Sequence, residues 1–139
     1  MGGTSGAIYA IFLNAVANRL YKLTADSPSL GVSELIQEAL QSGLDELCRY
    51  TPARIGHRTL MDALIPFVKN YTLDGSLKAA LAEARKGAES TRQMAASLGR
   101  ASYVGQDRFD EEGGIPDPGA LGVVSILEGL SDGLDTRVN

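Results

Sequence analysis

The stretch Met1–Gly6, MGGTSG, is a glycine-rich turn that runs directly into the apolar stretch Ala7–Leu13, AIYAIFL. Glycines allow a tight turn and a close approach to a ligand, and Thr4 and Ser5 can cap a helix. Free backbone amides at a helix start attract anions. The stretch therefore predicts a helix from about Ser5 to Leu23. The residues before it form either a phosphate-binding turn or, as the alternative, a flexible end or a plain helix cap.

Two further helices are expected in the middle of the chain. One begins near Ser33, because its apolar residues recur at three-and-four spacing and form one stripe. The stripe consists of Leu35, Ile36, Ala39, Leu40, Gly43, Leu44 and Leu47. The next helix opens at Thr59 and Asp62, which have capping-box spacing, and Pro66 is expected to bend it or limit its length.

Two more helices complete the pattern. A fourth begins near Ser76, and its apolar and small residues continue through Thr91 and Ala95 to Leu98. In the last helix, Asp117 is the expected cap and Pro118 the first helical residue. No stretch shows the alternation of a half-buried strand. The sequence therefore predicts an all-α fold, an antiparallel helical bundle, within a single domain over residues 1–139.

Composition excludes several function classes. The 139 residues have a formal net charge of −4 and no basic cluster, which argues against nucleic-acid binding. The single Cys48 excludes an internal disulfide and favours a reducing compartment, so we expect a cytoplasmic protein. The apolar run Ala7–Leu13 is too short to span a membrane, and no membrane partner is expected.

Four motifs, taken in order, resemble one known family. After the opening turn come Gly56–Leu64 (GHRTLMDAL), Gly99–Tyr103 (GRASY) and Pro116–Ala120 (PDPGA). In this order they resemble the nucleotide-binding, DhaL-type C-terminal domain of dihydroxyacetone (glycerone) kinases. Tyr50–Arg54 (YTPAR) is most similar to the single-chain eukaryotic form. The resemblance covers nearly the whole chain and implies a barrel of antiparallel helices with nucleotide at one rim.

The resemblance also implies which residues contact ATP or ADP. Thr4 and Ser5 match a phosphate-contacting pair. The remaining matches are Thr51, Thr59 and Leu60, which line the nucleotide pocket, Arg100, and Asp117, Pro118 and Gly119 at the sugar and adenine end. Arg100 can reach a phosphate or brace the rim. Simple helix caps at Thr59 and Asp117 are the alternative interpretation of those two residues.

Metal binding and catalysis are not assigned to any residue of this chain. Family members hold Mg²⁺ with an aspartate cluster in a segment upstream of the opening turn, so the resemblance implies a domain truncated at its amino end. His57 stands where relatives usually have aspartate. A role for His57 as a general base is disfavoured, because a loop imidazole is more often solvated.

The expected function is therefore that of the nucleotide-binding part of a kinase that transfers phosphate from ATP to dihydroxyacetone. A dihydroxyacetone-binding domain, in cis or in trans, would supply the acceptor. The alternative is a catalytically silent helical remnant that acts as a binding or interaction module. Self-association is expected if missing helices leave an apolar patch exposed.

Overall fold

The all-α prediction is confirmed in the residues that the structure describes. The computed structural model describes residues 3–26, 29–95 and 114–138, which form five α-helices and one short 3₁₀ turn, with no strand among them. No helix in this part of the chain is long and apolar enough to cross a membrane. The helices form two compact units, Met1–Pro52 with Val68–Gly75, and Ala53–Phe67 with Ser76–Asn139.

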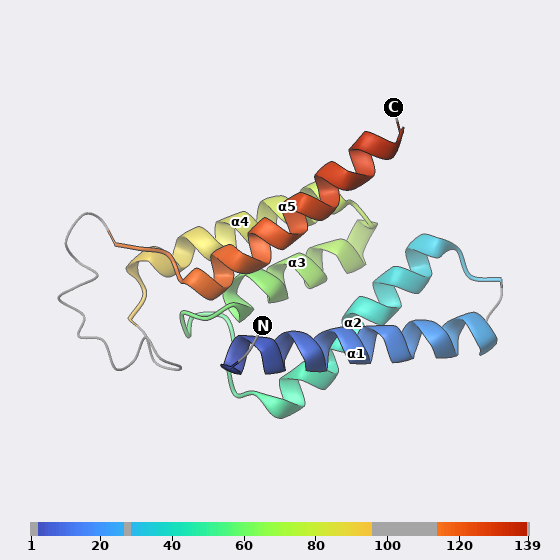
Figure 1. Ribbon diagram of the computed structural model, residues 1–139, viewed down its shortest axis with the longest axis horizontal. Helices are drawn as coiled ribbons and strands as arrows, with labels where there is room; N and C mark the ends of the chain where they lie inside the picture. The colour runs from blue at the N-terminus through green and yellow to red at the C-terminus, as the bar shows by residue number, and fades with distance from the viewer. Residues whose placement is uncertain (1–2, 27–28, 96–113, 139) are drawn as a thin grey trace. The chain divides into compact units, whose positions relative to one another are not determined.

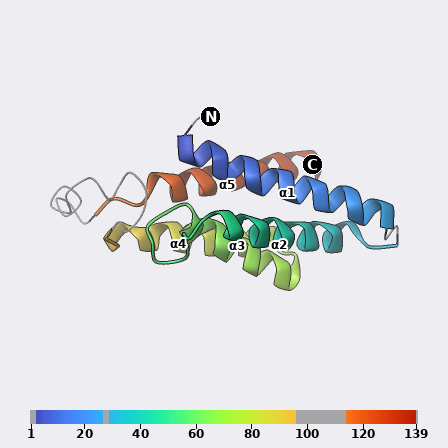
Figure 2. The ribbon, with the colours of Figure 1, turned by 90° about the horizontal axis from the view of Figure 1, so that it is seen from below.

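The first unit is built on an antiparallel helical hairpin. Helix α1 (Gly3–Asp26) runs beside α2 (Val32–Tyr50), as Figure 1 and Figure 2 both show. The two helices approach closely at Gly43, where an added Cβ would lie 2.5 Å from Val16 Cγ2 and 3.2 Å from the Phe12 ring. A small residue at this crossing therefore lets the apolar stripe of α2 pack against α1.

Polar contacts add to this packing in the first unit. Arg19 of α1 forms an ion pair with Glu38 of α2. Gln37 Nε2 donates a hydrogen bond to the carbonyl oxygen of Tyr71, 3.3 Å away. Tyr71 belongs to the second half of α3 (Met61–Asp74), so this half of α3 is fastened to α2.

The second unit contains the first half of α3, α4 (Leu77–Ser90), the 3₁₀ turn η1 (Thr91–Gln93) and α5 (Pro118–Val138). Helix α4 begins next to Ser76 as predicted, and Ser76 caps it, because its Oγ accepts a hydrogen bond of 3.2 Å from the Ala79 amide. The predicted continuation of α4 through Ala95 is wrong, and Leu98 lies outside the described residues.

Thr91 provides the physical reason for the early end of α4. Its hydroxyl donates to the Ala88 carbonyl at 2.6 Å and accepts from the Asp117 amide at 2.7 Å. Side-chain bonds of this kind compete with helical hydrogen bonds. The backbone therefore tightens into η1, and Met94 follows with an extended conformation.

Pro66 does not end α3, which continues to Asp74. A proline has no amide hydrogen to offer to the carbonyl four residues earlier, which here belongs to Asp62. Helix α4 packs closely on that carbonyl through Gly87, where an added Cβ would lie only 1.9 Å from the Asp62 oxygen. The glycine therefore allows two helices of the second unit to cross at the site of the proline.

We predict that Gly87→Ala lowers the free energy of unfolding by about 1–3 kcal/mol, because the new methyl group must displace backbone rather than a flexible side chain. The matched control is Gly129→Ala on α5, where an added Cβ meets nothing within 4 Å. That variant should gain up to about 1 kcal/mol from helix propensity. Urea unfolding measures both, and equal effects of the two substitutions would contradict the close crossing.

Candidate functional site

A buried carboxylate organises the loop that leads into α3. Asp62 is fully buried. Its Oδ1 accepts a hydrogen bond of 2.6 Å from the Gly56 amide, and its Oδ2 accepts one of 2.8 Å from the Thr59 amide. Thr59 Oγ1 in turn accepts a bond of 3.2 Å from the Met61 amide. The predicted cap at Thr59 and Asp62 is therefore present and also fixes the shape of the loop before it.

Arg58 lies between the two amides that Asp62 holds. Its φ of 56° is in the left-handed region, which is rare for a residue with a side chain. The side chain is buried, and its guanidinium donates a hydrogen bond of 2.7 Å to the carbonyl oxygen of Ile115. The loop before α3 is thereby tied to the segment before α5.

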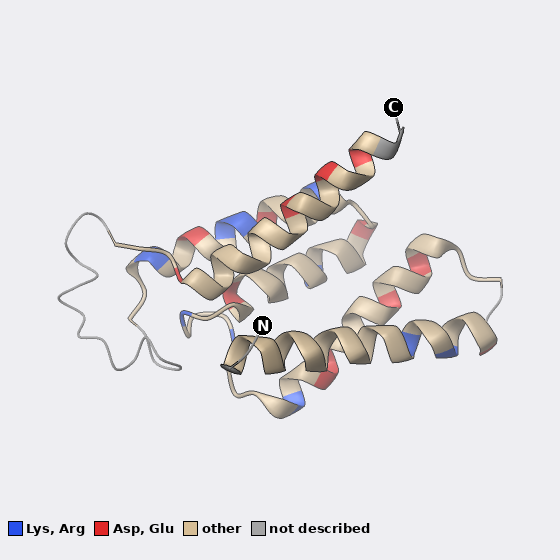
Figure 3. Cartoon of the chain, viewed as in Figure 1, with Lys and Arg blue, Asp and Glu red and all other residues tan. Residues whose placement is uncertain are grey.

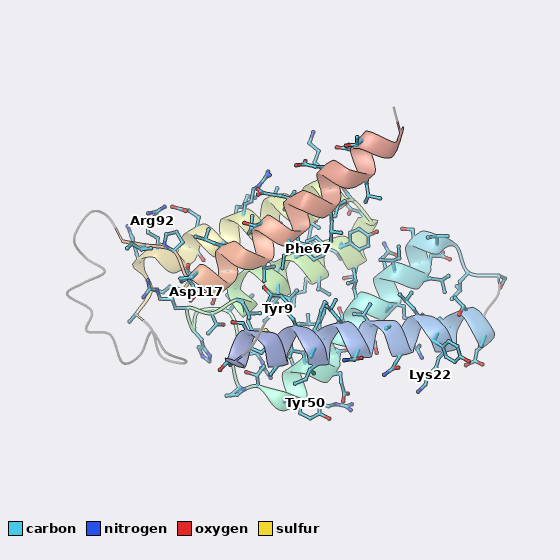
Figure 4. All side chains as sticks on the ribbon, in the orientation of Figure 1. Tyr9, Lys22, Tyr50, Phe67, Arg92 and Asp117 are labelled. Atoms are coloured by element: carbon cyan, nitrogen blue, oxygen red, sulfur yellow. The ribbon has the colours of Figure 1, made fainter. Side chains whose placement is uncertain are left out.

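The start of α5 is capped by Asp117, as the sequence predicted. Asp117 Oδ2 accepts a hydrogen bond of 2.8 Å from the Ala120 amide. From the other side, the Thr91 hydroxyl accepts the Asp117 amide hydrogen. Figure 4 shows Asp117 at the start of α5, at the same end of the second unit as Arg92.

Leu60 and Gly119 bring the starts of α3 and α5 together. A Cβ added to Gly119 would lie 3.3 Å from Leu60 Cβ and 2.9 Å from Asp117 Oδ2. Leu60 is buried, whereas Pro118, which precedes Gly119 in α5, is exposed. The structure therefore gathers one group of predicted site residues at one end of the second unit. This group comprises Thr59, Leu60, Asp117, Pro118 and Gly119.

The electrostatic environment of Asp117 follows from this arrangement. Burial raises the pKa of its carboxyl above the ordinary value, and the nearby Asp62 adds to the increase. Hydrogen bonds from the Ala120 and Gly119 amides and the charge of Arg58 act in the opposite direction and lower the pKa. Burial is the largest of these effects, so the site disfavours the ionised form of Asp117 relative to water.

The remaining predicted residues of the described chain lie in the first unit. Because α1 begins at Gly3, Thr4 and Ser5 lie inside its first turn, where they are exposed. Thr51 follows α2, and its amide donates to the Leu47 carbonyl at 3.2 Å. Since α1 and α2 are antiparallel, these three residues share one end of the hairpin. Arg100 lies outside the described residues.

The first unit contains a hollow that was not predicted from the sequence. An open groove of about 570 Å³ runs between α1 and α2. Polar residues line both sides of the groove, most of them four positions apart along their helix. These polar residues are Asn14, Asn18, Arg19 and Lys22 on α1 and Ser42, Glu46 and Tyr50 on α2. Figure 3 shows basic residues in the second half of α1. The four-residue polar spacing was the available signal, but none of the predicted nucleotide-contacting residues lines this groove.

His57 has a structural role in the loop before α3. Its Nδ1 accepts a hydrogen bond of 3.2 Å from the Arg54 amide, and its own amide donates to the Arg54 carbonyl at 3.3 Å. The imidazole is half-buried rather than fully solvated. These contacts close a turn in the loop before α3.

Comparisons with known proteins show the family to which the chain belongs. The model of the DAK2 domain family matches residues 1–132, and the chain belongs to this family. A dihydroxyacetone kinase of Komagataella pastoris is 45% identical over 136 residues, and the human triokinase/FMN cyclase is 33% identical over 144 residues. These matches cover 95% and 98% of this chain, but only 22% and 23% of the relatives.

Solved structures show the same fold. The dihydroxyacetone kinase of C. freundii in its native form superposes with a TM-score of 0.68 and 28% identity, covering 96% of this chain and 21% of that one. The same kinase in complex with AMP-PNP and Mg²⁺ gives a TM-score of 0.65. The chain thus spans about a fifth of the length of the proteins it matches.

Asp117 should make the stability of the protein depend on pH. Because its folded-state pKa is raised above 3.8, its contribution to stability is present below pH 3.8 and is lost as the pH rises through the folded-state value. Asp117→Asn cannot ionise and keeps an oxygen that can cap α5. We therefore predict that the wild-type protein loses stability relative to Asp117→Asn as the pH rises toward neutrality.

Urea unfolding of both proteins across this pH range measures the difference. Asp132→Asn, which removes a carboxylate from an exposed position on the same helix, serves as the control. If the wild-type protein gains stability over Asp117→Asn with rising pH, the account of the site is wrong.

Proposed function

We propose that this chain binds the nucleotide in a dihydroxyacetone kinase that transfers phosphate from ATP to dihydroxyacetone. Residues 1–139 then form one DhaL-type nucleotide-binding domain. Thr4 and Ser5 contact the phosphates, with Thr51 nearby in the same unit. In the other unit, Thr59, Leu60 and the segment Asp117–Gly119 contact the sugar and the base.

One observation carries this proposal. The starts of α3 and α5 meet at Leu60 and Gly119, with no side chain on Gly119 to separate them. Asp117 offers a half-buried carboxylate there, a group that accepts hydrogen bonds from sugar hydroxyls. A solved relative with the same fold is in complex with AMP-PNP and Mg²⁺, which supports a nucleotide as the ligand.

The first turn of α1 supports a phosphate-binding role. Amides of a first helical turn have no partner within the helix, and the helix dipole favours an anion there. The first turn of α1 contains no acidic residue that would repel a phosphate. The hydroxyls of Thr4 and Ser5 are exposed at this position and can donate to phosphate oxygens.

Magnesium has no fitting site among the described residues, which contain no group of three or more His, Cys, Asp or Glu side chains that could hold a metal ion. We therefore assign no step to an ion held by these residues. In phosphoryl transfer the protein mainly positions the phosphates and stabilises developing charge. This chain supplies the nucleotide contacts, and a dihydroxyacetone-binding domain in cis or in trans supplies the acceptor.

We choose dihydroxyacetone as the acceptor because of the sequence identity between this chain and its relatives. Dihydroxyacetone kinases of yeasts reach 45% identity with this chain, against 33% for the human triokinase/FMN cyclase. The competing proposal is a catalytically silent helical remnant that keeps the fold but not the kinase chemistry and acts as a binding or interaction module. Absence of nucleotide binding would favour this second proposal.

We predict that the 139-residue protein binds ADP weakly and that Mg²⁺ adds little affinity. Thr4→Ala combined with Ser5→Ala should weaken ADP binding about tenfold or more, because a hydrogen bond to a charged group contributes about 1.5–3 kcal/mol. Titration calorimetry with and without Mg²⁺ measures both effects.

Thr24→Ala is the matched control, since Thr24 lies near the other end of α1 and its exposed hydroxyl donates to the Tyr21 carbonyl. This variant should bind ADP like the wild-type protein. Absence of ADP binding by the wild-type protein would support the silent module, and a large gain with Mg²⁺ would contradict the metal assignment.

A further inference from the structure

Arg58 is not among the residues proposed to contact the nucleotide, yet its placement is unusual. It is a charged residue with 3% of its surface exposed, on a loop whose backbone is left-handed at that residue. Such a conformation is strained and persists only when the surroundings enforce it. The Asp62 carboxylate enforces it, because it binds the amides of Gly56 and Thr59 on either side.

The loop directs the Arg58 guanidinium at the segment before α5. This segment is held at three points, one by Arg58 in the loop before α3 and two by residues of η1. Arg58 binds the Ile115 carbonyl at 2.7 Å, Arg92 binds the Gly114 carbonyl at 2.7 Å, and Thr91 accepts the Asp117 amide hydrogen. Among Arg58, Arg92 and Thr91, Arg58 is the residue whose positive charge acts on the Asp117 carboxylate.

We propose that Arg58 is a positioning residue that acts through Asp117: it fixes the segment 114–117 and keeps a positive charge beside the carboxylate that receives the nucleotide sugar. The identity of the ligand in this inference rests on the proposed function. The placement of Arg58 beside the segment before α5 does not depend on that function. Arg58 donates to the main-chain carbonyl of Ile115, so this contact holds the backbone before α5 and does not itself use the Asp117 carboxylate.

The test replaces Arg58 in the intact chain by Gln, which keeps a donor but no charge, and by Lys, which keeps the charge. Two quantities are measured: the pH midpoint of Asp117 by NMR of its carboxyl carbon, and the affinity for ADP by calorimetry. Asp62 faces Asp117 from α3, while Arg92 and its partner Glu89 lie on η1 and the end of α4. These groups are unchanged in all the variants.

In Arg58→Gln we expect a higher Asp117 midpoint and about tenfold weaker ADP binding, since the cation that lowers the pKa is gone. In Arg58→Lys we expect the wild-type midpoint and recovery of most of the ADP affinity. Arg54→Met removes an exposed cation from the same loop and should change neither quantity.

An unchanged Asp117 midpoint in Arg58→Gln overturns the inference. If Arg58→Gln does not fold, Arg58→Lys decides: loss of ADP binding with a wild-type Asp117 midpoint would show that Arg58 does not act through Asp117. If the wild-type protein itself does not bind ADP, the proposed function fails, while the titration still tests the placement of Arg58.

Discussion

The buried carboxylate of Asp62 is the interaction on which the site in the second unit depends. Burial of a carboxylate is unfavourable unless hydrogen bonds replace those of water, and here two backbone amides do so. The bonds fix the loop before α3 and enforce the left-handed conformation of Arg58. Arg58 then ties the loop to the segment before α5, so one carboxylate connects the starts of two helices.

The main-chain carbonyl of Asp62 also takes part in packing, because α4 lies against it. It is the group that Pro66 leaves without a helical donor, and α4 packs on it through Gly87. Asp62 therefore connects to α5 through its side chain and to α4 through its backbone. This double role places the α4–α5 pair relative to the start of α3 within the second unit, and it explains why the site residues from two distant motifs lie together there.

Local signals in the sequence predicted much of this. Helix starts at Ser76 and Asp117 were predicted because caps depend on residues within three positions of each other. The end of α4 was not predicted correctly, because it depends on a hydrogen bond between Thr91 and Asp117, which are far apart in the sequence. The close approach of α4 to α3 at Pro66 depends in the same way on a distant residue, Gly87. Nonlocal contacts of this kind leave no periodic signal along the chain.

In the candidate site, too, individual residues were predicted from the sequence, whereas their contacts with one another were not. Leu60 and Gly119 were singled out by resemblance to a family, and their proximity is a finding of the structure. Arg58 was overlooked, although its position between Gly56 and Asp62 within one motif was visible. The groove between α1 and α2 was also missed, because polar residues at four-residue spacing usually indicate a solvated helix face.

The most direct test of the nucleotide assignment is a titration of the isotopically labelled chain with ADP, followed by NMR of the backbone amides. The account predicts that the largest shifts fall on Thr4 and Ser5 in the first unit and on Leu60, Gly119 and Ala120 in the second. Shifts concentrated instead along the groove between α1 and α2, at Asn14, Asn18 and Tyr50, would contradict it.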